Sequence, residues 1–212
     1  MVNNQTTNGI EAIASDITDA VINLEKELND YFLPLKERNV IVLEPKVFLA
    51  DAYINLFGSG KSYSNFCTFT NDVYTGEVYD GLNENSPIVL ITAVRLPIDV
   101  SGKFSKKVYE QNEGILASNQ VRQGIFGFPK DVPILFYSDH INKEQKNEIN
   151  KLSGVRTYIQ NPLQKKYPTE KDISNVLNNA AHEMLETKYR NLLEASNSLQ
   201  NIFLKYQESK KL

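Results

Sequence analysis

The chain has little of what most catalytic and metal sites are built from. Its 212 residues include no tryptophan, one cysteine and two histidines. A single thiol, Cys67, can form neither an internal disulfide nor a cysteine zinc site, so a reducing, cytoplasmic setting is the expectation. Neither sign of charge is in large excess, because 23 basic and 26 acidic residues give a net charge of −3. The absence of a broad basic field argues against nucleic acid as the main partner.

Long hydrophobic runs are missing as well. No apolar run approaches the roughly 20 residues that a helix needs to cross a bilayer, so no membrane partner is expected. The first nine residues, MVNNQTTNG, are polar and lack the basic and apolar regions of a secretory signal peptide. Hydrophobic residues make up 41% of the chain, an ordinary value for a globular protein. Length and composition together predict a single domain that folds without disulfides or metals.

The first incomplete motif is GSGKS, residues 58–62. A phosphate-binding loop needs a further glycine, which would stand where Asn55 is, and a helix that starts after Lys61. The β-prone run SYSNFCTFT follows instead. We therefore expect a glycine turn here, followed by a β-hairpin over residues 64–80 that turns near Gly76.

Other catalytic motifs are absent or broken. His182 opens HEMLE, in which a zinc protease would need a second histidine in place of Glu186. Neither the G-x-S-x-G serine motif nor the G-x-G-x-x-G dinucleotide fingerprint occurs in the chain. No cofactor and no metal ion are expected, and the broken motifs favour a chain that is not an enzyme without deciding the question.

A strand–helix–strand unit over residues 132–160 is the clearest structural pattern. VPILFYSDH has the composition of a buried strand, NKEQKNEINKLSG that of a helix and VRTYIQ that of a second strand. IVLITAV, residues 88–94, predicts a further buried strand next to residues 132–137. The sequence thus predicts an α/β fold with a central mixed sheet, and leaves an α+β arrangement open.

The carboxyl end of the strand in this unit is a possible ligand site. Ser138, Asp139 and His140 end VPILFYSDH, and open α/β sheets bind their ligands at this edge. Glu113 and Arg122, from a helix expected within residues 104–126, are candidates to converge on the same place. This reading makes the chain a small Rossmann-like enzyme or ligand-binding domain, and is the alternative hypothesis for its function.

Long amphipathic helices are expected at both ends of the chain. Residues 9–32 keep apolar side chains at three- and four-residue steps, and so does a segment that Thr169 and Asp172 would cap. The expected organisation is an α/β body with its N-terminal helix over 1–168, followed by a helical segment over 169–212. That segment is longer than a body of this size would cover, unless it breaks at Ala195–Ser198, where helix propensity is low.

An uncovered apolar stripe on the C-terminal helix would be an interface. Its predicted residues are Leu192, Leu199, Phe203 and Tyr206. The leading hypothesis is a non-catalytic subunit of a homo-oligomer or a larger protein assembly. The chain is also rich in asparagine, with 23 residues. On this basis we expect a phage or virus particle component, such as a connector or neck subunit, assembled in the host cytoplasm.

Overall fold

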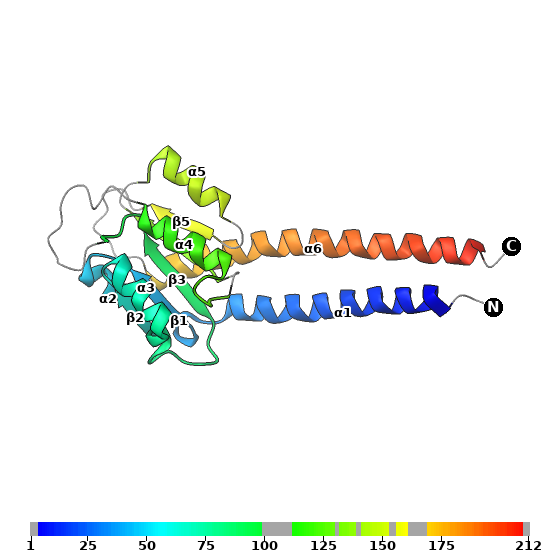
Figure 1. The fold of residues 1–212 in the computed structure, drawn as a ribbon, viewed down its shortest axis with the longest axis horizontal. Helices are drawn as coiled ribbons and strands as arrows, with labels where there is room; N and C mark the ends of the chain where they lie inside the picture. Colours follow the sequence, from blue (N-terminus) through cyan, green and yellow to red (C-terminus); the bar gives the residue numbers. More distant parts are fainter. Residues whose placement is uncertain are drawn as a thin grey trace. The chain divides into compact units, whose positions relative to one another are not determined.

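A computed structural model describes residues 4–98, 112–129, 132–138, 141–152, 156–160 and 169–209 (Figure 1). The chain forms two compact units. The first, which we call the body, spans Leu33–Ala180. The second, which we call the helical unit, combines Met1–Phe32 with Ala181–Leu212.

The body alternates strands and helices along the chain. Its strands are β1 (Asn39–Leu43), β2 (Ser59–Tyr63), β3 (Ile88–Ala93), β4 (Ile134–Ser138) and β5 (Arg156–Gln160). Its helices are α2 (Val47–Ile54), α3 (Phe66–Thr75), α4 (Glu113–Gln123), α5 (Lys143–Lys151) and the start of α6 (Glu170–Ser209), with short 3-10 turns η1 (Leu35–Glu37) and η2 (Glu77–Tyr79). The helical unit holds α1 (Asn4–Phe32) and the rest of α6.

The five strands form one sheet in the order β2-β1-β3-β4-β5. All four described pairings are parallel, with Val40 opposite Val89 and Leu90 opposite Ile134. The α/β class is confirmed, and the predicted adjacency of residues 88–94 and 132–137 is confirmed with it. The sheet is parallel where a mixed sheet was expected, because a helix connects each described strand to the next and returns the chain to the same edge.

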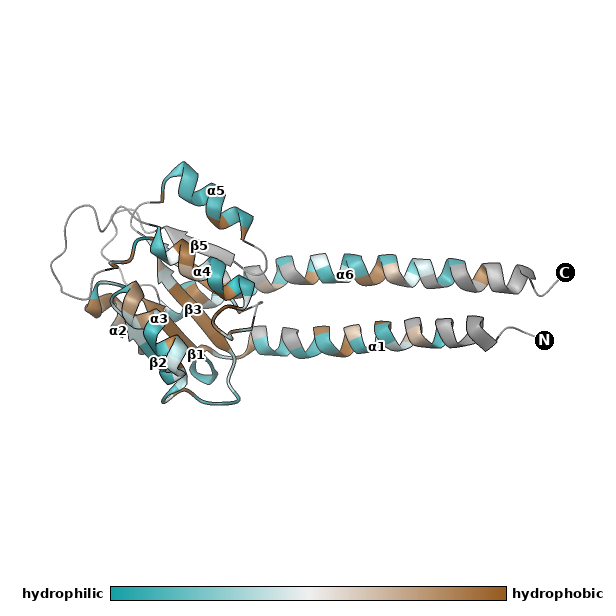
Figure 2. Ribbon diagram, viewed as in Figure 1, coloured by the Kyte–Doolittle hydropathy of each residue, from teal (hydrophilic) through white to brown (hydrophobic). Residues whose placement is uncertain are grey.

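Helices cover both faces of this sheet. Alternate residues of β1 point to opposite sides, so Ile41 packs among residues of α3, α4 and α5. Val42 packs on the other face with α2 and the start of α6, where Ile173 and Leu177 are buried. Strands covered on both faces read as continuous apolar runs, which explains the strong hydrophobicity of the central strands (Figure 2).

The predicted strand–helix–strand unit is confirmed as β4, α5 and β5. Asn142 caps α5, since its side chain accepts from the backbone N–H of Gln145 at 2.8 Å. The Gln145 side chain in turn accepts from the backbone N–H of Asn142 at 3.0 Å. This reciprocal capping box fixes the start of the helix. The helix ends at Lys151, before the end of the run NKEQKNEINKLSG that predicted it.

The β-hairpin expected over residues 64–80 is wrong, because this segment forms α3. Asn65 accepts a hydrogen bond from the backbone N–H of Thr68 at 2.8 Å and so caps the helix. Gly76, with φ of 82°, ends it in the left-handed conformation that favours glycine. Between these caps Phe69 and Val73, four residues apart, turn the same face to the core. Caps and this spacing outweigh the β propensity of the aromatic and β-branched residues.

The C-terminal helix is continuous. α6 runs for 40 residues and passes through Ala195–Ser198 without a break, so the break considered there does not occur. The predicted cap is confirmed: the Thr169 backbone N–H donates to Asp172 Oδ2 at 2.9 Å, and the Thr169 hydroxyl donates to the same oxygen at 2.7 Å. These bonds lower the pKa of the Asp172 carboxyl.

Candidate functional site

The carboxyl edge of the sheet contains one described residue of the predicted ligand site. Ser138 ends β4 and its side chain is half-buried. Asp139 and His140 lie outside the described residues. The strand order reverses between β1 and β3, and this is the part of a doubly wound sheet where a crevice opens for ligands. Because two of its three residues are not described, a ligand site at Ser138–His140 stays a prediction.

The expected convergence of Glu113 and Arg122 on that edge is wrong. Glu113 is the first residue of α4, whereas Arg122 lies at its far end. Arg122 is buried there, and its Nη1 donates to the backbone carbonyl of Val132, just before β4, at 2.7 Å. Because α4 connects two parallel strands, it runs back from the carboxyl edge to the amino edge. Only Glu113 stays near the predicted site, and partial burial raises the pKa of its carboxyl.

The described polar side chains near this edge form hydrogen bonds with one another or with the backbone. Gln145 Nε2 donates to Asn112 Oδ1 at 2.8 Å and links the N-termini of the two helices. A buried carboxylate, Glu44, follows β1 and accepts from the backbone N–H of Lys46 at 2.9 Å. Among the described residues, no group of three histidine, cysteine or carboxylate side chains is arranged to hold a metal ion.

The GSGKS motif forms most of edge strand β2, not the expected turn. Residues Ser59–Tyr63 pair with β1 along their whole length. A Cβ at Gly60 would approach Val40 Cγ1 to 2.8 Å, so the glycine permits close packing against the neighbouring strand. Lys61 Nζ lies 3.7 Å from Asp72 Oδ2 and donates to the backbone carbonyl of Glu77. The helix nearest in sequence, α3, begins only at Phe66, after the strand has ended.

The helical unit places two helices of equal length side by side. α1 has 29 residues, and the first eleven of the 40 residues of α6 belong to the body, which leaves 29 for this unit. The Phe32 ring, at the end of α1, meets the His182 ring edge-on at 6.3 Å between centroids. From this contact the two helices run in opposite chain directions within one compact unit (Figure 1).

Few of the described side chains in this pair of helices are buried. Of the side chains described in the unit, Ala181 alone is buried. Ile17, Leu24, Leu185 and Leu192 are half-buried, and none of them reaches the burial of the strand residues in the body. No described helix, α1 and α6 included, has an apolar stretch of the length needed to cross a bilayer.

Large apolar side chains of the helical unit are exposed to solvent. They are Val21, Ile22, Phe32, Tyr189, Leu193 and Leu204. Tyr189, at 64% exposed, lies four residues before Leu193 and fifteen before Leu204, and these spacings return to neighbouring positions on one face of a helix. We call Tyr189, Leu193 and Leu204 the α6 stripe.

The predicted interface residues all lie in α6, but only one can be described in detail. Leu192 is half-buried. Leu199, Phe203 and Tyr206 are helical in backbone, and their side chains lie outside the described residues. Sequence reasoning missed Leu193 and Leu204, because a search for a single apolar stripe assigns residues beside that stripe to the polar face.

Charge differs between the two helical segments. Met1–Phe32 holds six acidic residues against one lysine. Ala181–Leu212 holds four acidic residues against five lysines and arginines. A strongly acidic segment is thus combined with one whose charges nearly balance, and contact between two copies of the acidic segment is disfavoured.

No protein-family model and no curated protein matches the chain. One solved structure that resembles it carries the yeast Spc42 trimeric coiled coil, amino acids 181–211, fused to another structure. It shares 14% identity, covers 83% of this chain and 99% of that chain, and has a TM-score of 0.45. Another is the Vibrio vulnificus NanR protein complexed with ManNAc-6P, at 8% identity, covering 97% of this chain and 70% of that chain, with a TM-score of 0.32. Likenesses this loose carry no argument about fold or function.

Proposed function

We propose that the protein is a non-catalytic assembly subunit that associates with a second copy of itself through the helical unit. The observation that carries this proposal is that Ala181 alone is buried among the side chains described in that unit. Helices gain most of their stability in proteins by burying an apolar face. Two helices of 29 residues whose described side chains bury so little would gain stability from a further surface to pack against.

A second copy of the same helix pair supplies such a surface. Two antiparallel pairs of equal length can close into a four-helix bundle, the arrangement in which helices of this kind bury their apolar positions. Two-fold symmetry is the commonest form of self-association and uses the same patch on both copies. The α6 stripe and the exposed residues Val21 and Phe32 of α1 are then the positions that the bundle covers.

Charge favours one arrangement of the four helices. If each α1 neighbours the α6 of its own chain and the α6 of the partner, no two of the acidic segments Met1–Phe32 lie side by side. Placing α1 against α1 would bring six acidic residues of each copy together at one seam. Like charges opposed across an interface disfavour that pairing, so the alternating arrangement is preferred.

A paired substitution in the α6 stripe tests the proposal. Tyr189→Ser with Leu193→Ser removes two exposed apolar side chains and leaves the body unchanged. The wild type is expected to show at least twice the mass of one chain by light scattering, and the variant to shift toward the mass of one chain. Leu116→Ser, at a comparably exposed leucine of α4 in the body, is the matched control and should leave the mass unchanged.

Two results would contradict self-association. One is a wild-type mass equal to that of a single chain at concentrations of about 100 μM, where interfaces of standard size are occupied. The other is a variant that keeps the full assembly mass. Circular dichroism at 222 nm would accompany each measurement, so that unfolding of the variant is not mistaken for dissociation.

The narrower expectation of a phage or virus particle component rests on composition, and stays a prediction. So does the alternative of a Rossmann-like ligand-binding domain with its site at Ser138–His140. The strand order supports the alternative, because the reversal between β1 and β3 opens the carboxyl edge beside β4. Loss of a bound small molecule on Ser138→Ala, with the assembly mass unchanged, would favour that second function.

A further inference from the structure

An aromatic cluster in the body reaches the surface at one end of α3 and α4. Tyr74, near the end of α3, is 74% exposed, and Tyr79 of η2 is 41% exposed. Ile125, just after α4, is 49% exposed. We call these three residues the aromatic patch. They come together because both helices pack on the same face of the sheet and run from its carboxyl edge toward its amino edge.

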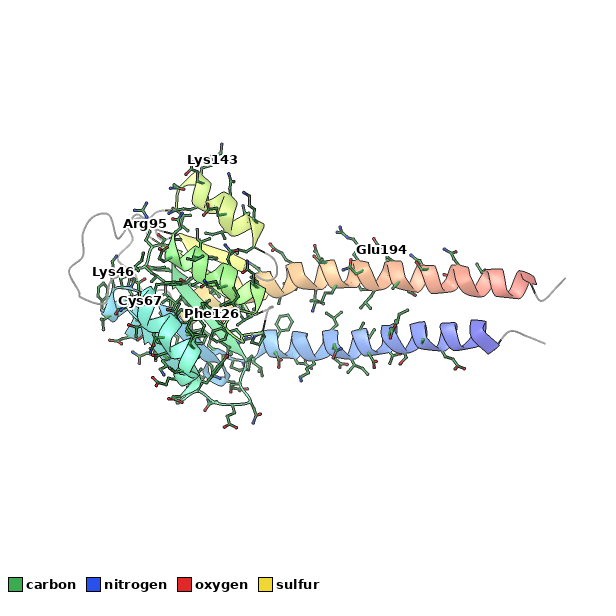
Figure 3. The ribbon with its side chains drawn as sticks, viewed as in Figure 1. Lys46, Cys67, Arg95, Phe126, Lys143 and Glu194 are labelled. Carbon is green, nitrogen blue, oxygen red and sulfur yellow. The ribbon has the colours of Figure 1, made fainter. Side chains whose placement is uncertain are left out.

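Buried rings support the aromatic patch from below. Tyr74 meets Phe126 edge-on at 6.3 Å between centroids, and Tyr79 lies 5.5 Å from Phe128. Phe69 contacts both phenylalanines, at 5.4 Å and 6.4 Å. Phe126 is labelled in Figure 3. A surface ring held by buried rings loses little conformational freedom on binding, and this is typical of residues that dominate an interface.

Two exposed acidic residues lie next to the aromatic patch in the sequence. Glu77 and Asp80 flank Tyr79 in sequence, and both are exposed. The Lys61 ammonium on β2 contacts the Asp72 carboxylate and the backbone carbonyl of Glu77. A partner segment that reaches the exposed Tyr79 ring therefore comes near two exposed acidic residues.

We propose that the aromatic patch binds a segment of another protein that is rich in lysine or arginine and carries apolar side chains. Exposed apolar surface rimmed by polar groups marks interaction sites. Tyrosine faces attract cationic side chains, and Glu77 and Asp80 add complementary charge. The same carboxylates would repel an acidic segment, so such a segment would bind more weakly. The patch belongs to the body, so this inference does not depend on self-association of the helical unit.

Fluorescence anisotropy with two labelled peptides tests the proposal on the full chain. One is a glycine–serine peptide that carries lysines and phenylalanines, and the other has glutamate in place of each lysine. The lysine peptide is expected to bind, with weaker binding as salt is raised, because exposed charges are screened. The glutamate peptide is expected not to bind. Equal binding of both peptides, or no binding of either at millimolar concentration, would overturn the proposal.

Substitutions locate the binding on the molecule. Tyr74→Ala should weaken the lysine peptide about tenfold, the loss typical of a modest interface hot spot. Glu77→Lys with Asp80→Lys should weaken it by a similar factor and flatten its salt dependence. The matched controls are Leu116→Ala and Glu144→Lys, exposed positions on α4 and α5. If the controls weaken binding as much as the patch variants do, the binding is a general effect of net charge and the proposal fails.

Discussion

Lys61 Nζ lies 3.7 Å from Asp72 Oδ2, and the same ammonium group donates to the backbone carbonyl of Glu77. Lys61 belongs to edge strand β2, Asp72 to α3 and Glu77 to η2. The lysine of the GSGKS motif thus joins three consecutive elements of the body. Its contacts account for a charged residue at this position without a bound phosphate.

A double-mutant cycle should reveal this link. Lys61→Ala, Asp72→Ala and the double variant are expected to give a coupling energy of about 0.5–1 kcal/mol. The value is modest because the two side chains are 26% and 16% exposed, and solvent screens part of their attraction. Urea unfolding of the wild type and the three variants gives the free energies from which the coupling energy is calculated. A coupling near zero would show that the pair contributes nothing, and saturable ATP binding lost in Lys61→Ala would restore the phosphate reading.

Tyr63 should make stability fall at high pH. Burial, and next the charge of the Asp72 carboxylate, raise the pKa of the Tyr63 phenol well above its ordinary value near 10. The folded chain therefore holds this proton more tightly than the unfolded chain. The stabilisation is fully present below about pH 10 and is lost as the pH rises beyond it, by up to about 1.4 kcal/mol per pH unit.

Tyr63→Phe isolates this effect, because phenylalanine has no proton to lose. The variant should lose less stability than the wild type between pH 9 and pH 11, by urea unfolding at each pH. At pH 7 its effect should be small, since the Tyr63 hydroxyl is buried without a hydrogen bond of ordinary geometry. Tyr74→Phe, at an exposed tyrosine, is the control. Identical pH slopes in Tyr63→Phe and the wild type would refute the assignment.

Two glycines should respond to alanine for different reasons. A Cβ at Gly114 would collide with the backbone carbonyl of Ala93, because the start of α4 packs directly on the end of β3. Gly114→Ala should therefore cost about 2–3 kcal/mol, in the range of overpacked cores. Gly76 has open space around its α-carbon but a φ of 82°, so Gly76→Ala should cost only about 1 kcal/mol. Thermal or urea unfolding compares them, and equal costs would contradict the packing argument.

The fold could be predicted from the sequence where burial and caps agree with propensity. Residues 88–94 and 132–137 are largely apolar runs without polar alternation, and such runs fit strands covered on both faces. Asn142 and Gln145 mark the start of α5 through a capping box. Prediction failed over residues 64–80, because aromatic and β-branched residues favour strands while Asn65 and Gly76, as caps, favour a helix.

The candidate sites were less predictable, because they depend on which ends of the helices meet. Glu113 and Arg122 are close in sequence, yet the direction of α4 places them at opposite edges of the sheet. The aromatic patch gave no local signal, since Tyr79 and Ile125 are 46 residues apart and come together only through packing on one face. The positions of the helices in the helical unit were predictable, but the exposure of most of their described side chains was not, because no single-helix pattern reveals it.

Truncation should separate the roles of the two units. Cutting the chain after Ala195 removes Leu204 and the end of α6 but leaves Ile173 and Leu177, which pack in the core of the body. The shortened chain is expected to stay folded, because its body is intact, and to assemble less, because part of the α6 stripe is gone. Light scattering would report the mass of the assembly, and urea unfolding would report the stability of the body.

Removal of residues 210–212 alone, beyond the end of α6, is the control and should change neither the mass nor the stability. A truncated chain that keeps the wild-type assembly mass, or that no longer folds, would show that the end of α6 is not an association element.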